Sequence, residues 1–145
     1  MSQVIEASEI LNLLPHRYPM MLVDRIVALD VEKRTITGIK NLTFNEAFFQ
    51  GHFQGHPVMP GVLQMEAMAQ VSGVLLAKIF GDAGRIFYFA AIDNARFRRP
   101  VVPGDQLRME VEMLVAKPRL SKAHVRAFVG DALASEADLM FSLAG

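Results

Sequence analysis

Two side chains that can transfer protons, His52 and Glu66, lie fourteen residues apart in this sequence. His52 falls in a segment rich in glycine and proline, 51–57 (Gly-His-Phe-Gln-Gly-His-Pro), and Glu66 falls in the strongly apolar stretch that follows. Histidine and glutamate are common general bases and acids in enzymes. Burial among Leu, Met, Val and Ala disfavours the charged form of a carboxyl group, which keeps it protonated near neutral pH. The pair therefore predicts general acid–base chemistry.

One long helix must carry Glu66. Pro60 suits the first position of a helix and Gly81 suits its end, so we expect a helix over residues 60–80, roughly 30 Å long. Apolar residues occupy most of its faces, which predicts that the rest of the protein encloses it. It also holds five polar or charged side chains, too many for a membrane span (Gln64, Glu66, Gln70, Ser72 and Lys78).

Most of the remaining chain predicts β-strands. The clearest is 106–115, where apolar residues alternate with mostly polar ones. A short helix is expected over 7–14, and the other expected strands cover residues 20–29, 34–40, 85–97, 121–129 and 132–144. An early buried helix followed by antiparallel strands predicts one α+β domain over residues 1–145, with a sheet that curls around the helix.

Composition excludes several classes of function. The chain has 145 residues, 52% of them hydrophobic, and a formal net charge of zero, which argues against a general nucleic-acid or membrane-surface role. The absence of cysteine excludes disulfides and a thiolate nucleophile. The N-terminus has no basic region followed by an apolar run, so no signal peptide is expected. These features favour a globular cytoplasmic protein.

Three motifs give the chain a family resemblance. The segment 51–70, preceded by Leu-Pro-His-Arg-Tyr-Pro at 14–19 and followed by Arg-Phe-Arg-Arg-Pro-Val-Val-Pro-Gly-Asp at 96–105, resembles the FabZ-type (3R)-hydroxyacyl-acyl carrier protein dehydratases. The resemblance runs from about residue 9 to the end. It implies a hot-dog fold, in which a curved antiparallel sheet wraps a central helix. It also implies an acyl carrier protein as partner, a catalytic homodimer usually assembled as a trimer of dimers, and no metal or redox cofactor.

The resemblance also assigns roles to residues. The family converts a (3R)-3-hydroxyacyl thioester into a trans-2-enoyl thioester; His52 would take the proton from C2, and Glu66 of the other subunit would protonate the departing hydroxyl, directly or through water. The Gly61 N–H would bond the thioester carbonyl, since a helix N-terminus offers unpaired N–H groups. Gln70, one turn beyond Glu66, would position Glu66 or the hydroxyl.

Two positions distinguish this chain within the family pattern. The sister FabA-type enzymes, which also isomerise the double bond, carry aspartate at the position of Glu66, so glutamate implies dehydration without isomerisation. Gln54 stands where the family usually has proline. Losing that backbone restraint two residues after His52 predicts a looser loop and a lower rate, with the reaction type unchanged.

Weaker candidates have ordinary structural alternatives. Tyr88 could gate an acyl tunnel, or pack on an aromatic strand. Arg96, Arg98 and Arg99 could dock an acidic carrier protein, or form a solvated face. His52 and His56 have a spacing seen in zinc helices, but Gly55 and Pro57 break any helix and no third ligand is near, so no metal site is predicted.

Alternatives remain for Glu66 and for the function. Glu66 could be a core carboxylate paired with an arginine, because an unpaired buried charge is costly. His16 is interpreted as structural, holding the first turn to the core. The other candidate functions are a hot-dog acyl thioesterase and a non-catalytic acyl-carrier binding module.

Overall fold

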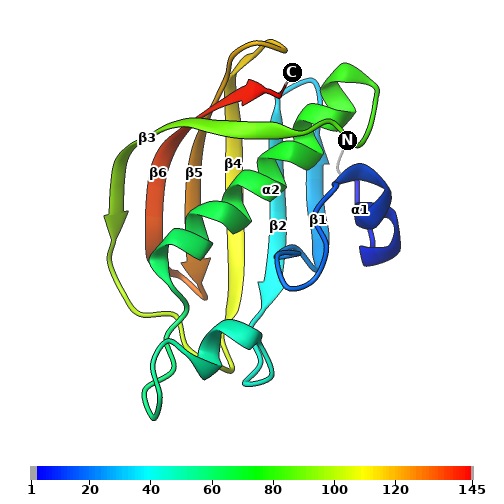
Figure 1. Cartoon of the computed structure of the whole chain (residues 1–145). Helices are drawn as coiled ribbons and strands as arrows, with labels where there is room; N and C mark the ends of the chain where they lie inside the picture. Colours follow the sequence, from blue (N-terminus) through cyan, green and yellow to red (C-terminus); the bar gives the residue numbers. More distant parts are fainter. Residues whose placement is uncertain (1–2, 145) are drawn as a thin grey trace.

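A computed structural model describes residues 3–144 as one six-stranded antiparallel sheet and a long helix (Figure 1). The strand order is β1-β2-β4-β5-β6-β3, so β1 and β3 form the two edges. In chain order the elements are α1 (Ala7–Leu13), β1 (Arg25–Asp30), β2 (Thr35–Asn41), the 3-10 helix η1 (Ala47–Gln50), α2 (Gly61–Phe80), β3 (Phe87–Phe97), β4 (Gln106–Ala116), β5 (Ser121–Val129) and β6 (Ala132–Leu143).

Helix α2 lies across one face of the sheet (Figure 1) and forms the centre of the core. Pro60 is its N-cap rather than its first residue, and Gly81 ends it in a left-handed conformation with φ 73°. By length and composition α2 could cross a membrane, but 56% of the apolar window is buried inside the protein. It is therefore the enclosed core helix that its apolar faces predict.

The sheet meets α2 through alternating apolar side chains. On β4, Leu107, Met109, Val111 and Met113 are all at most 3% exposed, which confirms the predicted alternation. On β2, a Cβ added to Gly38 would lie 2.8 Å from Cγ2 of Val71, so glycine is what lets α2 approach the sheet here. A sheet curved around one long helix is the hot-dog arrangement, and the predicted α+β class is confirmed.

Two predicted strands begin too early. β1 begins at Arg25 rather than at residue 20, because Met20 and Leu22 are hydrogen-bonded to the side chain of Gln70 on α2. The backbone reaches the sheet only at Asp24, whose N–H donates to the oxygen of Ile39 on β2. β3 begins at Phe87 rather than at residue 85, since Arg85 pairs with Asp82 in the preceding turn.

Candidate active site

His52 lies in the loop between η1 and α2 with its ring oriented by a backbone carbonyl. Its Nδ1 is 2.9 Å from the oxygen of Val58. A carbonyl can only accept, so Nδ1 carries the proton, and Nε2 of the neutral ring is left with a free lone pair. Nε2 makes no hydrogen bond within the described part of the chain. The arrangement suits a general base.

The loop around His52 is closed by backbone hydrogen bonds. The N–H of Val58 donates to the oxygen of His52 at 2.8 Å, and Phe53 and His56 exchange two N–H···O bonds of 2.9 and 2.8 Å. Gln54, the residue that stands in place of proline, is exposed in this turn. The lower rate expected from Gln54 stays a prediction.

Glu66 lies on α2 with one carboxylate oxygen held. Its Oε2 accepts a hydrogen bond of 2.9 Å from Nε2 of Gln70 and lies 3.3 Å from Nε2 of His16. Oε1 bonds to none of residues 3–144. The side chain is 21% exposed. One oxygen is therefore anchored while the other can meet a substrate.

Gln70 is buried, and its side-chain hydrogen bonds go to Glu66 and to the backbone of residues 20–22. Its Oε1 accepts from the N–H of Leu22 at 2.8 Å, and its Nε2 donates to the oxygen of Met20 at 2.6 Å as well as to Glu66. Because Oε1 accepts one hydrogen bond and Nε2 donates two, the orientation of the Gln70 amide is fixed. The predicted contact between Gln70 and Glu66 is present, and the segment 20–22 holds it.

Glu66 faces a cavity of about 60 Å³ that runs along α2. Small residues of α2 form one wall, Phe87 and Phe89 of β3 form another, and His16 lies beside Glu66 (small residues: Ala69, Gly73, Ala77). Its walls are mainly apolar, which suits a hydrocarbon group. His52 is not part of its lining, and no hydrogen bond or ion pair joins it to Glu66. One chain does not bring the two predicted catalytic groups together.

Comparisons with known proteins decide the family. The model of the FabA-like domain matches residues 14–138. The chain is 55% identical over 140 residues to the 3-hydroxyacyl-[acyl-carrier-protein] dehydratase FabZ of Desulforamulus reducens, covering 97% of this chain and 98% of the relative. The chain belongs to the FabZ-type dehydratases. The FabZ of Clostridioides difficile is 49% identical, with 97% and 98% covered.

Solved structures show that the fold alone does not separate a FabZ-type dehydratase from a thioesterase. The dehydratase heterocomplex ApeI:P from Xenorhabdus doucetiae matches with a TM-score of 0.78 at 17% identity, over 94% of this chain and 91% of that one. A hypothetical thioesterase with coenzyme A from Streptococcus pneumoniae matches with 0.59 at 11% identity, over 78% and 80%. Both have the same fold, so the FabZ relatives carry the distinction.

Gly61 is the first residue of α2, and its expected role as the oxyanion donor stays a prediction. Its N–H is at the first helical position and has no acceptor among the described residues. A Cβ at Gly61 would lie 2.6 Å from Cε1 and 2.9 Å from Cδ1 of Phe97. The ring of Phe97 thus packs directly on this glycine, and glycine is required by contact rather than by backbone angle.

We expect Gly61→Ala to lower kcat by about 10- to 100-fold, because the added methyl must displace either Phe97 or the start of α2, and sub-ångström to 1 Å shifts have effects of this size. Steady-state kinetics would measure it. Phe97→Val lacks both crowding ring atoms, so the double variant should recover part of the loss. Equal loss with and without Phe97→Val would assign the effect to something other than this contact.

The structure gives less support to the roles predicted for Tyr88 and for the three arginines, Arg96, Arg98 and Arg99. Tyr88 is 62% exposed on β3 and does not line the cavity, although its neighbours Phe87 and Phe89 do. Arg98 pairs with Glu136, with 2.6 Å between Nη2 and Oε2. Gating and carrier docking both stay predictions.

Arg96 and Arg99 differ from Arg98 in having no acidic partner among residues 3–144. Within the described residues they donate only to backbone oxygens, of Ala95 at 3.0 Å and of Pro100 at 3.4 Å. Both side chains are exposed. Their charges are therefore more available to an acidic partner than that of Arg98.

One residue of the candidate site was not connected with Glu66 by the sequence analysis. His16, interpreted as structural, contacts Glu66. The motif at 14–19 was a signal for it, but no local pattern indicates that it meets a side chain fifty residues away. No arginine of residues 3–144 forms an ion pair with Glu66, so the alternative of an arginine-paired core carboxylate is wrong for a single chain.

Proposed function

We propose that this FabZ-type enzyme removes water from a (3R)-3-hydroxyacyl chain on acyl carrier protein, giving the trans-2-enoyl thioester in the fatty acid elongation cycle. Relatives that match over nearly their whole length carry the name of this dehydratase. The observation that supports the chemistry best is the Glu66 carboxyl group, anchored through Oε2 by Gln70 at the edge of an apolar cavity.

The proposed reaction moves one proton at each residue. Nε2 of His52 takes the proton from C2, and the electron pair of that C–H bond forms the C2=C3 double bond. The C3–O bond breaks as Glu66 gives the proton on Oε1 to the hydroxyl, which leaves as water. The Gly61 N–H bonds the thioester oxygen while negative charge develops on it. Both residues then exchange protons with solvent to begin again.

Two copies of the chain are proposed to form each site. His52 and Glu66 do not meet within one chain. Edge strand β3 is eleven residues long and exposes Phe89, Ile92 and Phe97, which is the kind of edge that pairs with another strand. A two-fold dimer would contain two equivalent sites, each with His52 of one copy and Glu66 of the other. The trimer of dimers and the cytoplasmic location stay predictions.

Subunit mixing tests this two-copy site. His52→Ala and Glu66→Gln proteins should each be inactive, but unfolding and refolding an equal mixture should restore about one quarter of wild-type activity, since half of the dimers are mixed and each has one intact site. The double variant mixed with Glu66→Gln protein is the control, because no combination of those chains supplies both residues across an interface. No recovery in the first mixture would place both residues in one chain's site.

Product analysis separates the dehydratase from the alternative functions. The purified protein would be incubated with a medium-chain (3R)-3-hydroxyacyl-acyl carrier protein, and the products identified by mass and chromatography. We expect a trans-2-enoyl product with its thioester intact and no cis-3 product. Free acid would indicate a thioesterase, and binding without conversion would indicate a non-catalytic module.

Carrier docking is proposed for Arg96 and Arg99 in preference to Arg98. The support is their exposure and the absence of an acidic partner within the described residues, whereas Glu136 offsets the charge of Arg98. An acidic carrier protein would gain most from cations that are not already paired.

A further inference from the structure

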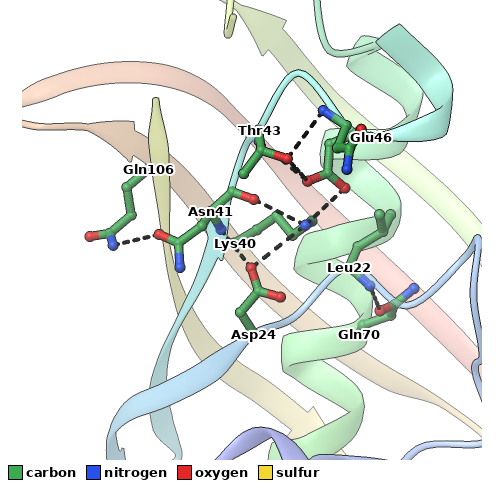
Figure 2. Close-up of polar contacts among 9 residues, drawn as sticks. Leu22, Asp24, Lys40, Asn41, Thr43, Glu46, Gln70 and Gln106 are labelled. Carbon is green, nitrogen blue, oxygen red and sulfur yellow. Dashed lines mark hydrogen bonds and ion pairs between the residues drawn. The ribbon is translucent and has the colours of Figure 1, made fainter. Parts of the chain in front are cut away.

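Lys40 is a buried charged residue that the proposed reaction does not use. It lies near the end of β2 and is only 6% exposed. Its Nζ is 3.1 Å from Oε1 of Glu46 and 3.6 Å from Oδ2 of Asp24, and it donates to the oxygen of Asn41 at 3.0 Å (Figure 2). A buried ammonium group requires such partners. Lys40 thus links two segments of the chain, one that contains Glu46 and one that contains Asp24.

The first segment leads to His52. Glu46 is the N-cap of η1, its backbone oxygen accepts from the N–H of Phe49 at 3.2 Å, and its Oε2 accepts from the N–H of Thr43 at 3.3 Å. Phe49 is buried in the core. One residue, Gly51, separates η1 from His52. The place of Glu46 therefore fixes where the His52 loop begins.

The second segment leads to Glu66. Oδ2 of Asp24 accepts from the N–H of Asn41 at 2.7 Å, and the N–H of Asp24 donates to the oxygen of Ile39 at 2.8 Å. Two residues earlier, the N–H of Leu22 donates to Oε1 of Gln70 (Figure 2). Nε2 of the same Gln70 side chain donates to Glu66. Lys40 thus joins the segment that fixes the base to the segment that fixes the acid.

We propose that Lys40 is a positioning residue, which holds the His52 loop through Glu46 and the Gln70–Glu66 pair through Asp24. This inference rests on the proposed function of His52 and Glu66. A buried ion pair is weak evidence for stability, because apolar replacements of such pairs are often neutral. The position of Lys40 between the two catalytic segments gives it a role that an apolar residue of equal size could not fill.

The first test is Lys40→Met, which keeps the unbranched chain and removes the charge. We expect kcat to fall about 10- to 100-fold with little change in KM, because the reacting groups are displaced while the acyl cavity is unchanged. Lys40→Arg keeps the charge and should recover part of kcat. The pH dependence of kcat/KM should also change in Lys40→Met, since the surroundings of His52 change. All assays use the assembled enzyme below its unfolding temperature.

A second pair of variants separates positioning from stability. Lys40→Met leaves two carboxylates without their cation, so it also lowers the melting temperature. Adding Glu46→Gln removes one of these charges and should restore part of the melting temperature. The value of kcat should stay low, because the Lys40 ammonium group is still missing. If kcat rose in step with the melting temperature, the role of Lys40 would be structural only and the inference would be overturned.

Lys78→Met is the matched control. It breaks an ion pair with Glu9, 3.3 Å between Nζ and Oε2, that lies away from both catalytic segments, and its kcat should stay at the wild-type value. His52→Ala is measured in the same assay. If it is inactive while folded Lys40→Met matches wild type, the inference alone is wrong. If His52→Ala remains active, the proposed function is wrong and the inference falls with it. Should Lys40→Met fail to fold, Glu46→Gln decides by the same criteria.

Discussion

Replacing His52 by alanine should lower kcat by about 10²- to 10⁴-fold, the contribution that a positioned general base commonly makes. The imidazole has one hydrogen bond within the described residues, from Nδ1 to the oxygen of Val58, and it lies in a loop outside the core. Its removal should therefore have little effect on folding. Steady-state kinetics on a 3-hydroxyacyl-acyl carrier protein, with thermal unfolding measured on the same samples, would check both expectations.

Two variants sharpen this experiment. His52→Gln keeps an amide that can donate to the oxygen of Val58 but cannot act as a base, so it should be as inactive as His52→Ala. His56→Ala changes an exposed histidine four residues away whose side chain bonds to none of residues 3–144, and it should keep wild-type kcat. If His52→Ala retained more than about a tenth of kcat, another group would have to abstract the proton.

Local sequence signals predicted the elements that carry the site. Pro60 and Gly81 bounded α2 to within one residue, because a cap is a property of a few neighbouring residues. The alternation over 106–115 predicted which side of β4 is buried for the same reason. The extent of β1 was wrong, since residues 20–22 are held by the side chain of Gln70, and no local pattern contains that contact.

Local sequence patterns could not predict the polar contacts between residues far apart in the chain. Gln70 was expected to reach Glu66 one turn away, but its bonds to Met20 and Leu22 join residues about fifty positions apart. The burial of Lys40 depends on counter-charges from two other segments that only the fold assembles. That His52 and Glu66 act together rests on the family resemblance. In the single chain no hydrogen bond or ion pair joins them, which is compatible with a site between two copies.

Replacing Glu66 by glutamine should also lower kcat by about 10²- to 10⁴-fold, because an amide cannot give the proton that the departing hydroxyl needs. The change is nearly isosteric. The amide oxygen of the new side chain can accept from Gln70 and lie beside His16 as Oε2 does now, so the cavity should keep its shape. KM should change little, which distinguishes loss of acid catalysis from loss of binding.

Two further substitutions define what Glu66 contributes. Glu112→Gln removes an exposed carboxylate from β4, away from the cavity, and should keep full activity. Glu66→Asp keeps the acid but shortens it by one methylene, which draws its oxygen away from Gln70, so dehydration should continue at a reduced rate. A cis-3 product from Glu66→Asp, absent from wild type, would show that this residue sets the choice between dehydration and isomerisation. Wild-type kcat in Glu66→Gln would mean that the leaving hydroxyl takes its proton from another group.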